Sequence, residues 1–299
     1  MKRGRRHFLK EVLASFCGVR VFAADPPRAA AGSGPRVAAE PDPLRFRVAT
    51  DGWGGAGVAE VEGLLQSAAG VLWKYFPGLK REPFVVVRGR EGPIVQYQRN
   101  VIGEIVMKLD TEDRRWCQYA YQFSHEFCHI LCGFNDDPWK HHRWFEETLC
   151  ETASLFVLRR LADVWTERPP WPNWRGYAPE FRRYAQHVMD SRSQVGKGHL
   201  GDFYRKHRQT LENTPRDRTL NGAMALPLLE LLEGTPESWE AVVWLNSAPS
   251  AEGETFAAYL ERWRAAVPGR HQGFVTEVMR RFGVAGLRKG AAEAVHSRD

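Results

Sequence analysis

Two histidines four residues apart, with a glutamate directly after the first, constrain this chain more than any other feature. They are His125, Glu126 and His129, within SHEFCHILCGF at 124–134. Side chains at i and i+4 stack on one face of a helix, so both imidazoles can reach one metal ion. Glu126 is displaced by about 100° around the helix, near a water on that ion. The alternative is a core helix with two hydrogen-bonded histidines.

The segments before this motif predict a small mixed sheet. Three strands and one helix are expected there, at 45–50, 83–89 and 104–110 for the strands and at 58–76 for the helix. The segment 104–110 alternates apolar and polar side chains, which is typical of a half-exposed strand at the edge of a sheet. The motif itself falls on a helix expected at 115–132, which Gly133 closes.

A second helix, expected at 144–165, carries candidate acidic partners for the histidines. Catalytic zinc keeps three protein ligands and one open position, so a third ligand is needed. Glu147 lies 18 positions after His129, and Glu151 follows one turn later on the same face. Buried carboxylates need partners, and one acid on the metal with one on a histidine ring N–H would satisfy both. The alternative is that these acids and Glu146 lie on a solvated face.

The two motifs together point to a known family. HEFCH at 125–129 and WFEE at 144–147 resemble the HExxH helix and the glutamate-bearing second helix of the gluzincin zinc metallopeptidases, the peptidase MA-like group that includes thermolysin and its related aminopeptidases. Matching residues span about 104–156. The resemblance implies an α+β, zincin-like fold and an enzyme that hydrolyses peptide bonds in a peptide or protein substrate.

The resemblance also implies roles for individual residues. His125, His129 and Glu147 would hold one Zn²⁺ per chain, and Glu126 would act as general base toward a metal-activated water. In thermolysin an acid one turn after the ligand glutamate holds the first histidine, and Glu151 occupies that place here. These assignments make the helix pair the expected catalytic centre.

Substrate binding and oxyanion stabilisation are less determined by the sequence. The resemblance implies that the strand at 104–110 pairs with an extended substrate. The aminopeptidases carry a transition-state tyrosine shortly before a Gly-Ala pair, and Thr219 stands at that place here. The remaining candidates for the oxyanion stabiliser are Tyr177, Tyr184, His199, Tyr204, His207 and Arg218.

Two other functions fit the same residues. One is a non-catalytic zinc-binding or peptide-binding protein that keeps the fold, and the other is a hydrolase of a non-protein amide such as cell-wall peptide. Glu126 argues against a structural zinc site, because such a site is usually closed by four ligands and needs no base. A thiolate ligand is an alternative, although small cysteines usually fill a tight core. The cysteines concerned are Cys128, Cys132 and Cys150.

The distribution of charge separates the N-terminus from the body. The formal net charge is +6, and residues 1–24 hold six basic and one acidic side chain, which leaves +1 for the rest. A nearly neutral body gives no electrostatic footprint for nucleic acid. RRHFLK at 5–10 resembles a twin-arginine export signal, which predicts a periplasmic or extracellular protein without a membrane span in the mature chain. The alternative is a basic amphipathic helix.

The remainder of the chain predicts a mainly helical half. The segment 167–179 is a Trp/Pro-rich loop that either walls the cleft or packs against the helices that follow. An α+β fold with a helical subdomain is therefore expected. The expected boundaries are 1–24 for the signal peptide, 25–44 for a flexible tether, 45–166 for the zincin-like subdomain, 167–290 for the helical subdomain and 291–299 for a disordered tail.

Overall fold

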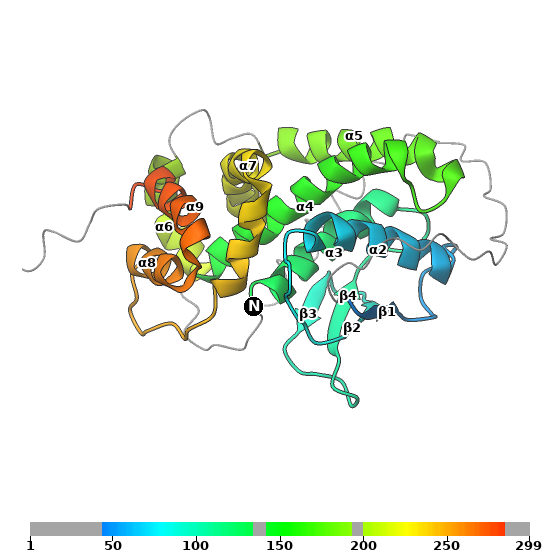
Figure 1. Ribbon diagram of the computed structural model, residues 1–299, viewed down its shortest axis with the longest axis horizontal. Helices are drawn as coiled ribbons and strands as arrows, with labels where there is room; N and C mark the ends of the chain where they lie inside the picture. Colours follow the sequence, from blue (N-terminus) through cyan, green and yellow to red (C-terminus); the bar gives the residue numbers. More distant parts are fainter. Residues whose placement is uncertain (1–43, 134–141, 193–199, 285–299) are drawn as a thin grey trace, which may run out of the picture.

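The computed structural model shows a mixed α+β fold (Figure 1). It describes residues 44–133, 142–192 and 200–284. The expected signal peptide, nearly all of the expected tether and the expected tail lie outside these residues, and their assignments stay predictions. Within the described part, no helix combines the length and apolar character needed to cross a membrane.

The described residues form one small mixed sheet, as the sequence predicts. Its strands are β1 (Phe46–Val48), β2 (Phe84–Arg88), β3 (Ile94–Gln96) and β4 (Ile105–Leu109). Their order across the sheet is β1-β2-β4-β3. Strand β2 pairs in parallel with both β1 and β4, whereas β3 runs antiparallel to β4.

The alternation at 104–110 predicts a strand at the edge of the sheet, and that prediction is wrong. Strand β4 lies between β2 and β3, and its Met107 is aligned with Val86 on one side and Val95 on the other. The alternation arises because apolar side chains of β4 face the core while Lys108 is half-buried on the opposite face. The edge strand β3 spans three residues, which is too short for a periodic pattern.

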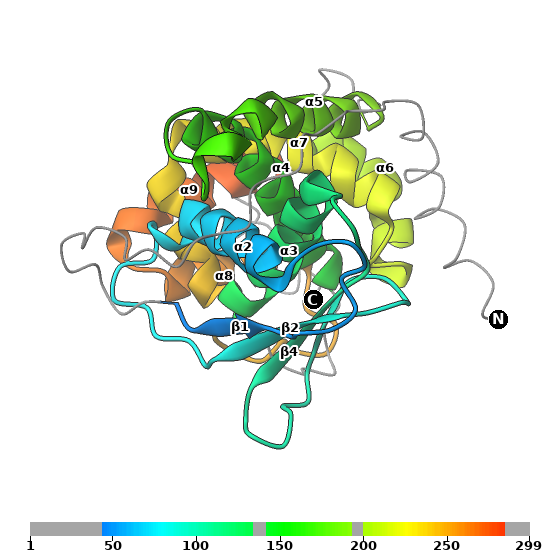
Figure 2. The ribbon, with the colours of Figure 1, turned by 90° about the vertical axis from the view of Figure 1, so that its right-hand side faces the viewer.

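Helices α2 (Val58–Trp73) and α3 (Trp116–Leu131) cover the sheet (Figure 2). Helix α4 (Arg143–Glu167) crosses behind these two helices. Helix α3 ends where Gly133 takes a φ of 76°, a left-handed conformation that glycine adopts without steric cost. Helix α4 is buried on all sides over most of its length, because it packs against α3, α5 and α7.

The C-terminal half is helical, as expected. Its elements are η1 (Pro172–Tyr177), α5 (Ala178–Asp190), α6 (Leu200–Asn213), α7 (Arg218–Gly234), η2 (Pro236–Trp244), α8 (Phe256–Ala266) and α9 (Gly269–Arg281). The Trp/Pro-rich segment packs against α3 and α4 at Trp174, which is buried with its ring centroid 5.0 Å from Trp116 and 5.2 Å from Trp165. Aromatic packing of this kind fixes the segment against α3 and α4.

Candidate metal centre

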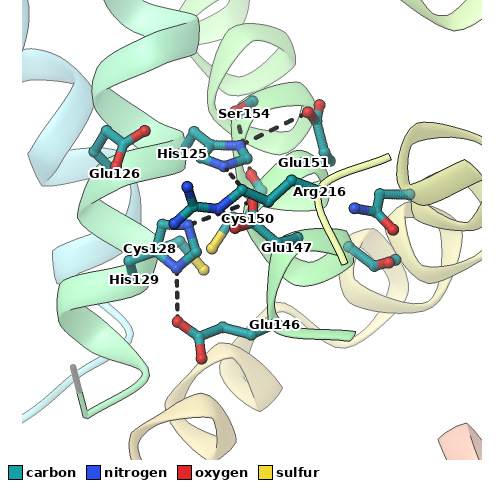
Figure 3. A network of polar contacts seen from close by, with 12 residues as sticks. His125, Glu126, Cys128, His129, Glu146, Glu147, Cys150, Glu151, Ser154 and Arg216 are labelled. Carbon is teal, nitrogen blue, oxygen red and sulfur yellow. Dashed lines mark hydrogen bonds and ion pairs between the residues drawn. The ribbon is translucent and has the colours of Figure 1, made fainter. Parts of the chain in front are cut away.

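Helix α3 turns its two histidines toward α4 because its opposite face packs on the sheet. Phe123 and Phe127 contact Phe84 of β2, with ring centroids 6.3 and 5.9 Å apart. Two residues along a helix correspond to a rotation of about 200°, so His125 and His129 point away from the sheet. Both histidines are buried, and their rings meet edge to face with centroids 5.1 Å apart (Figure 3).

Glu147 on α4 faces both imidazoles. Its Oε2 lies 3.2 Å from His125 Nε2 and 3.7 Å from His129 Nε2. Three ligand atoms arranged tetrahedrally around Zn²⁺ at about 2.0–2.1 Å lie about 3.3–3.4 Å from one another. The two distances from Glu147 Oε2 to the histidine nitrogens are therefore close to the spacing of ligand atoms around one metal ion.

A second donor set shares the same histidines. The ligand atoms of His125, His129 and Cys150 all lie within 4.8 Å of one another, and all three residues are buried, so this group could hold a metal ion. Glu147 and Cys150 are therefore both candidates for the third ligand beside the two histidines. Behind the histidines, the sulfurs of Cys128 and Cys132 are 4.0 Å apart, and neither forms a disulfide.

The other ring nitrogen of the second histidine has a partner that the sequence did not identify. Glu146 Oε1 lies 2.6 Å from His129 Nδ1, and the amide of Asn246 donates to Glu146 Oε2 over 2.9 Å. A carboxylate on the second nitrogen fixes the orientation of a metal-binding imidazole and raises its basicity. The available signal was the position of Glu146 directly before Glu147, 17 residues after the histidine.

Glu151 is held mainly by an arginine. Arg192 Nη1 donates to its Oε2 over 2.6 Å, Tyr121 donates to the same oxygen, and His125 Nδ1 is 3.9 Å from the other oxygen. The histidine contact implied by the family resemblance is thus electrostatic at this distance. Burial opposes ionisation, but Arg192 and then His125 lower the pKa of Glu151 to about 2. The carboxylate is therefore charged.

Buried neighbours in the centre also shift the pKa values of Glu147 and His129. Burial would raise the pKa of Glu147, but His129 and His125 hold it well below its usual range. Burial would lower the pKa of His129, but Glu147 and Glu146 hold it well above its usual range. Protonation of His129 and binding of a metal ion to it would therefore oppose each other. Glu146, Glu147 and Glu151 are all buried, so the alternative that they lie on a solvated face of the helix is wrong.

Glu126 lies apart from this network (Figure 3). Its side chain is buried, and its Oε2 accepts a hydrogen bond of 2.8 Å from the backbone N–H of Val95 on β3. Within the described residues this is the polar contact that the structure gives Glu126. The glutamate of the motif therefore connects α3 to the true edge strand of the sheet.

One arginine approaches the centre from the C-terminal half. Arg216, in the segment before α7, donates from Nε to Glu147 Oε1 over 3.2 Å. The arginine side chain is 41% exposed and the glutamate side chain 9%. Sequence patterns could not predict this contact, because 69 residues separate the two positions.

Two of the sequence candidates for the oxyanion stabiliser contact side chains outside the centre. Tyr177 contacts the sulfur of Cys117 at 3.4 Å, and Tyr204 stacks on Trp144 with ring centroids 5.3 Å apart. The remaining described candidates are Tyr184 against Tyr121, His207 against Phe203, and Arg218 at the start of α7. His199 lies outside the described residues.

Comparison with known proteins adds no relative to this description. No family model, no curated protein and no solved structure matches the chain. The fold is established as mixed α+β, and a buried histidine-containing group could hold a metal ion. Function must therefore be inferred from the chemistry of the site.

Proposed function

We propose that this chain is an exported zinc metallopeptidase of the gluzincin type, with a zincin-like fold. The observation that carries the proposal is the position of Glu147 Oε2, 3.2 and 3.7 Å from the facing nitrogens of His125 and His129. Two imidazoles and one carboxylate are a donor set that catalytic zinc sites use, with a fourth position open to substrate. The glutamate required as base follows the first histidine directly.

Each residue around the ion would have a separate role. His125, His129 and Glu147 would hold one Zn²⁺, which supplies Lewis acidity toward the scissile carbonyl and toward water. Glu146 would keep the His129 ring in a single orientation and tautomer. Glu151, held in place by Arg192, would keep its other oxygen facing Nδ1 of His125.

Glu126 would act as the general base. It would accept a proton from water and deliver it to the leaving amine, the role that positioned carboxylates have in such hydrolysis. The N–H of Val95 occupies Oε2 and leaves Oε1 for this exchange. Hydrogen bonds of catalytic groups often tighten only when substrate binds, so its separation from the histidine network is compatible with the role.

The substrate would bind along the edge of the sheet. The family resemblance implies that an extended peptide adds to an edge strand, and β3 rather than β4 occupies that edge here. Because Val95 of β3 also holds Glu126, a peptide aligned on β3 would lie next to the base. Peptides and proteins are therefore the proposed substrates.

The experiment measures zinc and peptide hydrolysis in the wild type and in Glu126→Gln. Glutamine keeps a carbonyl oxygen for the N–H of Val95, so the fold and the zinc should be retained while the base is lost. We expect one zinc per chain in both proteins and hydrolysis of a mixed peptide library by the wild type alone. Glu212→Gln, a change in a helical surface pair with Arg208, is the matched control. Equal hydrolysis by both proteins would contradict the proposal.

A non-catalytic zinc-binding protein is the second candidate, favoured by the sulfur of Cys150 close to both histidines. With Glu147 and Cys150 both bound, the site would have four protein ligands and no open position, as structural zinc sites do. Cobalt substitution separates the two functions, because a cobalt–thiolate bond gives a charge-transfer band that Cys150→Ala would abolish. Cell-wall peptides in the same hydrolysis assay test the non-protein amide alternative.

A further inference from the structure

Arg216 is held in a fixed backbone position beside the metal centre. The side chain of Asp217 caps helix α7 by accepting hydrogen bonds from the following amides, including Leu220 N at 3.1 Å. On the other side, Asn221 donates to the carbonyl of Pro215 over 2.8 Å. These two bonds bracket Arg216, so its side chain leaves a rigid segment and not a free loop end.

The guanidinium of Arg216 is only partly used. Its Nε bonds Glu147, and no other hydrogen bond or ion pair joins Arg216 to the described residues. Arginine carries five N–H donors in a planar fork, so both Nη groups keep their donors. Arg192 differs, because its side chain is 10% exposed and is committed to Glu151. Of these two arginines, Arg216 is the one open to a ligand.

The location of Arg216 gives these free donors a function. Its side chain extends across the histidine pair in the view of Figure 3, and it is 41% exposed while the Glu147 side chain that it contacts is 9% exposed. Peptide hydrolysis develops negative charge on the carbonyl oxygen, and positioned donors that stabilise this charge give a large share of catalysis. An arginine remains charged at all working pH values and matches two oxygens at once.

We propose that Arg216 forms an anion-binding site on the exposed side of the metal centre, where it binds an anionic oxygen of the substrate. That oxygen is either the oxyanion that develops at the scissile carbonyl or a carboxylate that the substrate already carries. The inference rests on the proposed function, since it places substrate at the same centre. It adds Arg216 to the candidates for the oxyanion stabiliser, a role for which the sequence has Thr219 where the aminopeptidases carry a tyrosine.

The binding test uses zinc-loaded protein and inorganic phosphate, a tetrahedral oxyanion, followed by calorimetry. Arg216→Ala should weaken phosphate binding by about 10- to 100-fold, the range for hydrogen bonds to charged groups, and Arg216→Lys should recover part of it. Arg205→Ala removes an arginine from an exposed pair with Asp202 and should change nothing. Zinc affinity is measured in every variant. Phosphate affinity that stays unchanged in zinc-saturated Arg216→Ala overturns the proposal.

The kinetic test distinguishes the two sources of the oxygen. The same mixed peptide library is supplied as C-terminal amides without acidic residues and as free acids. If Arg216 binds the oxyanion, Arg216→Ala lowers kcat about 10²- to 10³-fold on both libraries. If it binds a substrate carboxylate, KM rises on the free acids alone. Unchanged kinetics on both overturn the proposal, whereas a wild type that hydrolyses neither library refutes the proposed function and leaves the phosphate result to decide on Arg216.

Discussion

Glu146→Gln tests the hydrogen-bond network behind the metal centre. Among its contacts with described residues, Glu146 accepts hydrogen bonds from His129 Nδ1 at 2.6 Å and from the amide of Asn246 at 2.9 Å. A glutamine has one side-chain acceptor where the carboxylate has two, so one buried donor must lose its partner. Loss of an outer partner of this kind costs about 10- to 100-fold in metal affinity, and the double loss of charge and acceptor places Glu146→Gln toward the upper end.

The assay is competition for zinc between the protein and a chromophoric chelator, repeated across a pH series. Glu147 and Glu146 both raise the pKa of His129, so removing Glu146 should lower that pKa and weaken the competition of the proton with zinc. The loss of zinc affinity should therefore be largest at alkaline pH, where proton competition is weakest in both proteins, and should shrink as the pH falls. The surface change Glu212→Gln should have no effect. Zinc affinity equal to wild type at alkaline pH would refute this account of Glu146.

Two further predictions concern the ion pair behind His125. Arg192→Ala leaves the buried charge of Glu151 without its main partner, so it should lower the free energy of unfolding by about 3–5 kcal/mol, measured by denaturant titration; an unchanged midpoint would contradict a buried pair. The folded-state pKa of Glu151 is depressed to about 2 from 4.5, so its contribution is present above pH 4.5 and lost as the pH falls toward 2. That loss is about 3 kcal/mol, and the acid limb of the stability curve should flatten in Glu151→Gln; an identical limb in both proteins would exclude this role.

Local periodicity was enough to predict the elements that carry the centre. The two central helices were expected at 115–132 and 144–165 and lie at Trp116–Leu131 and Arg143–Glu167. Residues on one helix have a determined angular spacing, so the histidines of α3 necessarily share a face. The position of Glu147 followed from the chemistry of a third ligand on the next helix. The assignment of these residues as zinc ligands stays a prediction.

What the sequence could not provide depends on contacts between distant segments. The edge strand was misplaced because pairing order is decided by long-range packing, and β3 is too short to show a pattern. The arginine partners were missed for the same reason: Arg192 is 41 residues from Glu151 and Arg216 is 69 residues from Glu147. A charged residue in a loop or helix end shows no periodicity that would indicate its partner.

X-ray absorption at the zinc edge of the zinc-loaded wild type tests the central claim most directly. The account predicts one zinc per chain, surrounded only by nitrogen and oxygen at about 2.0–2.2 Å, with imidazole scattering from His125 and His129. Glu147→Ala should reduce zinc affinity, while Cys150→Ala should leave the spectrum unchanged. A sulfur shell at about 2.3 Å, or a protein that binds no zinc, would contradict the account.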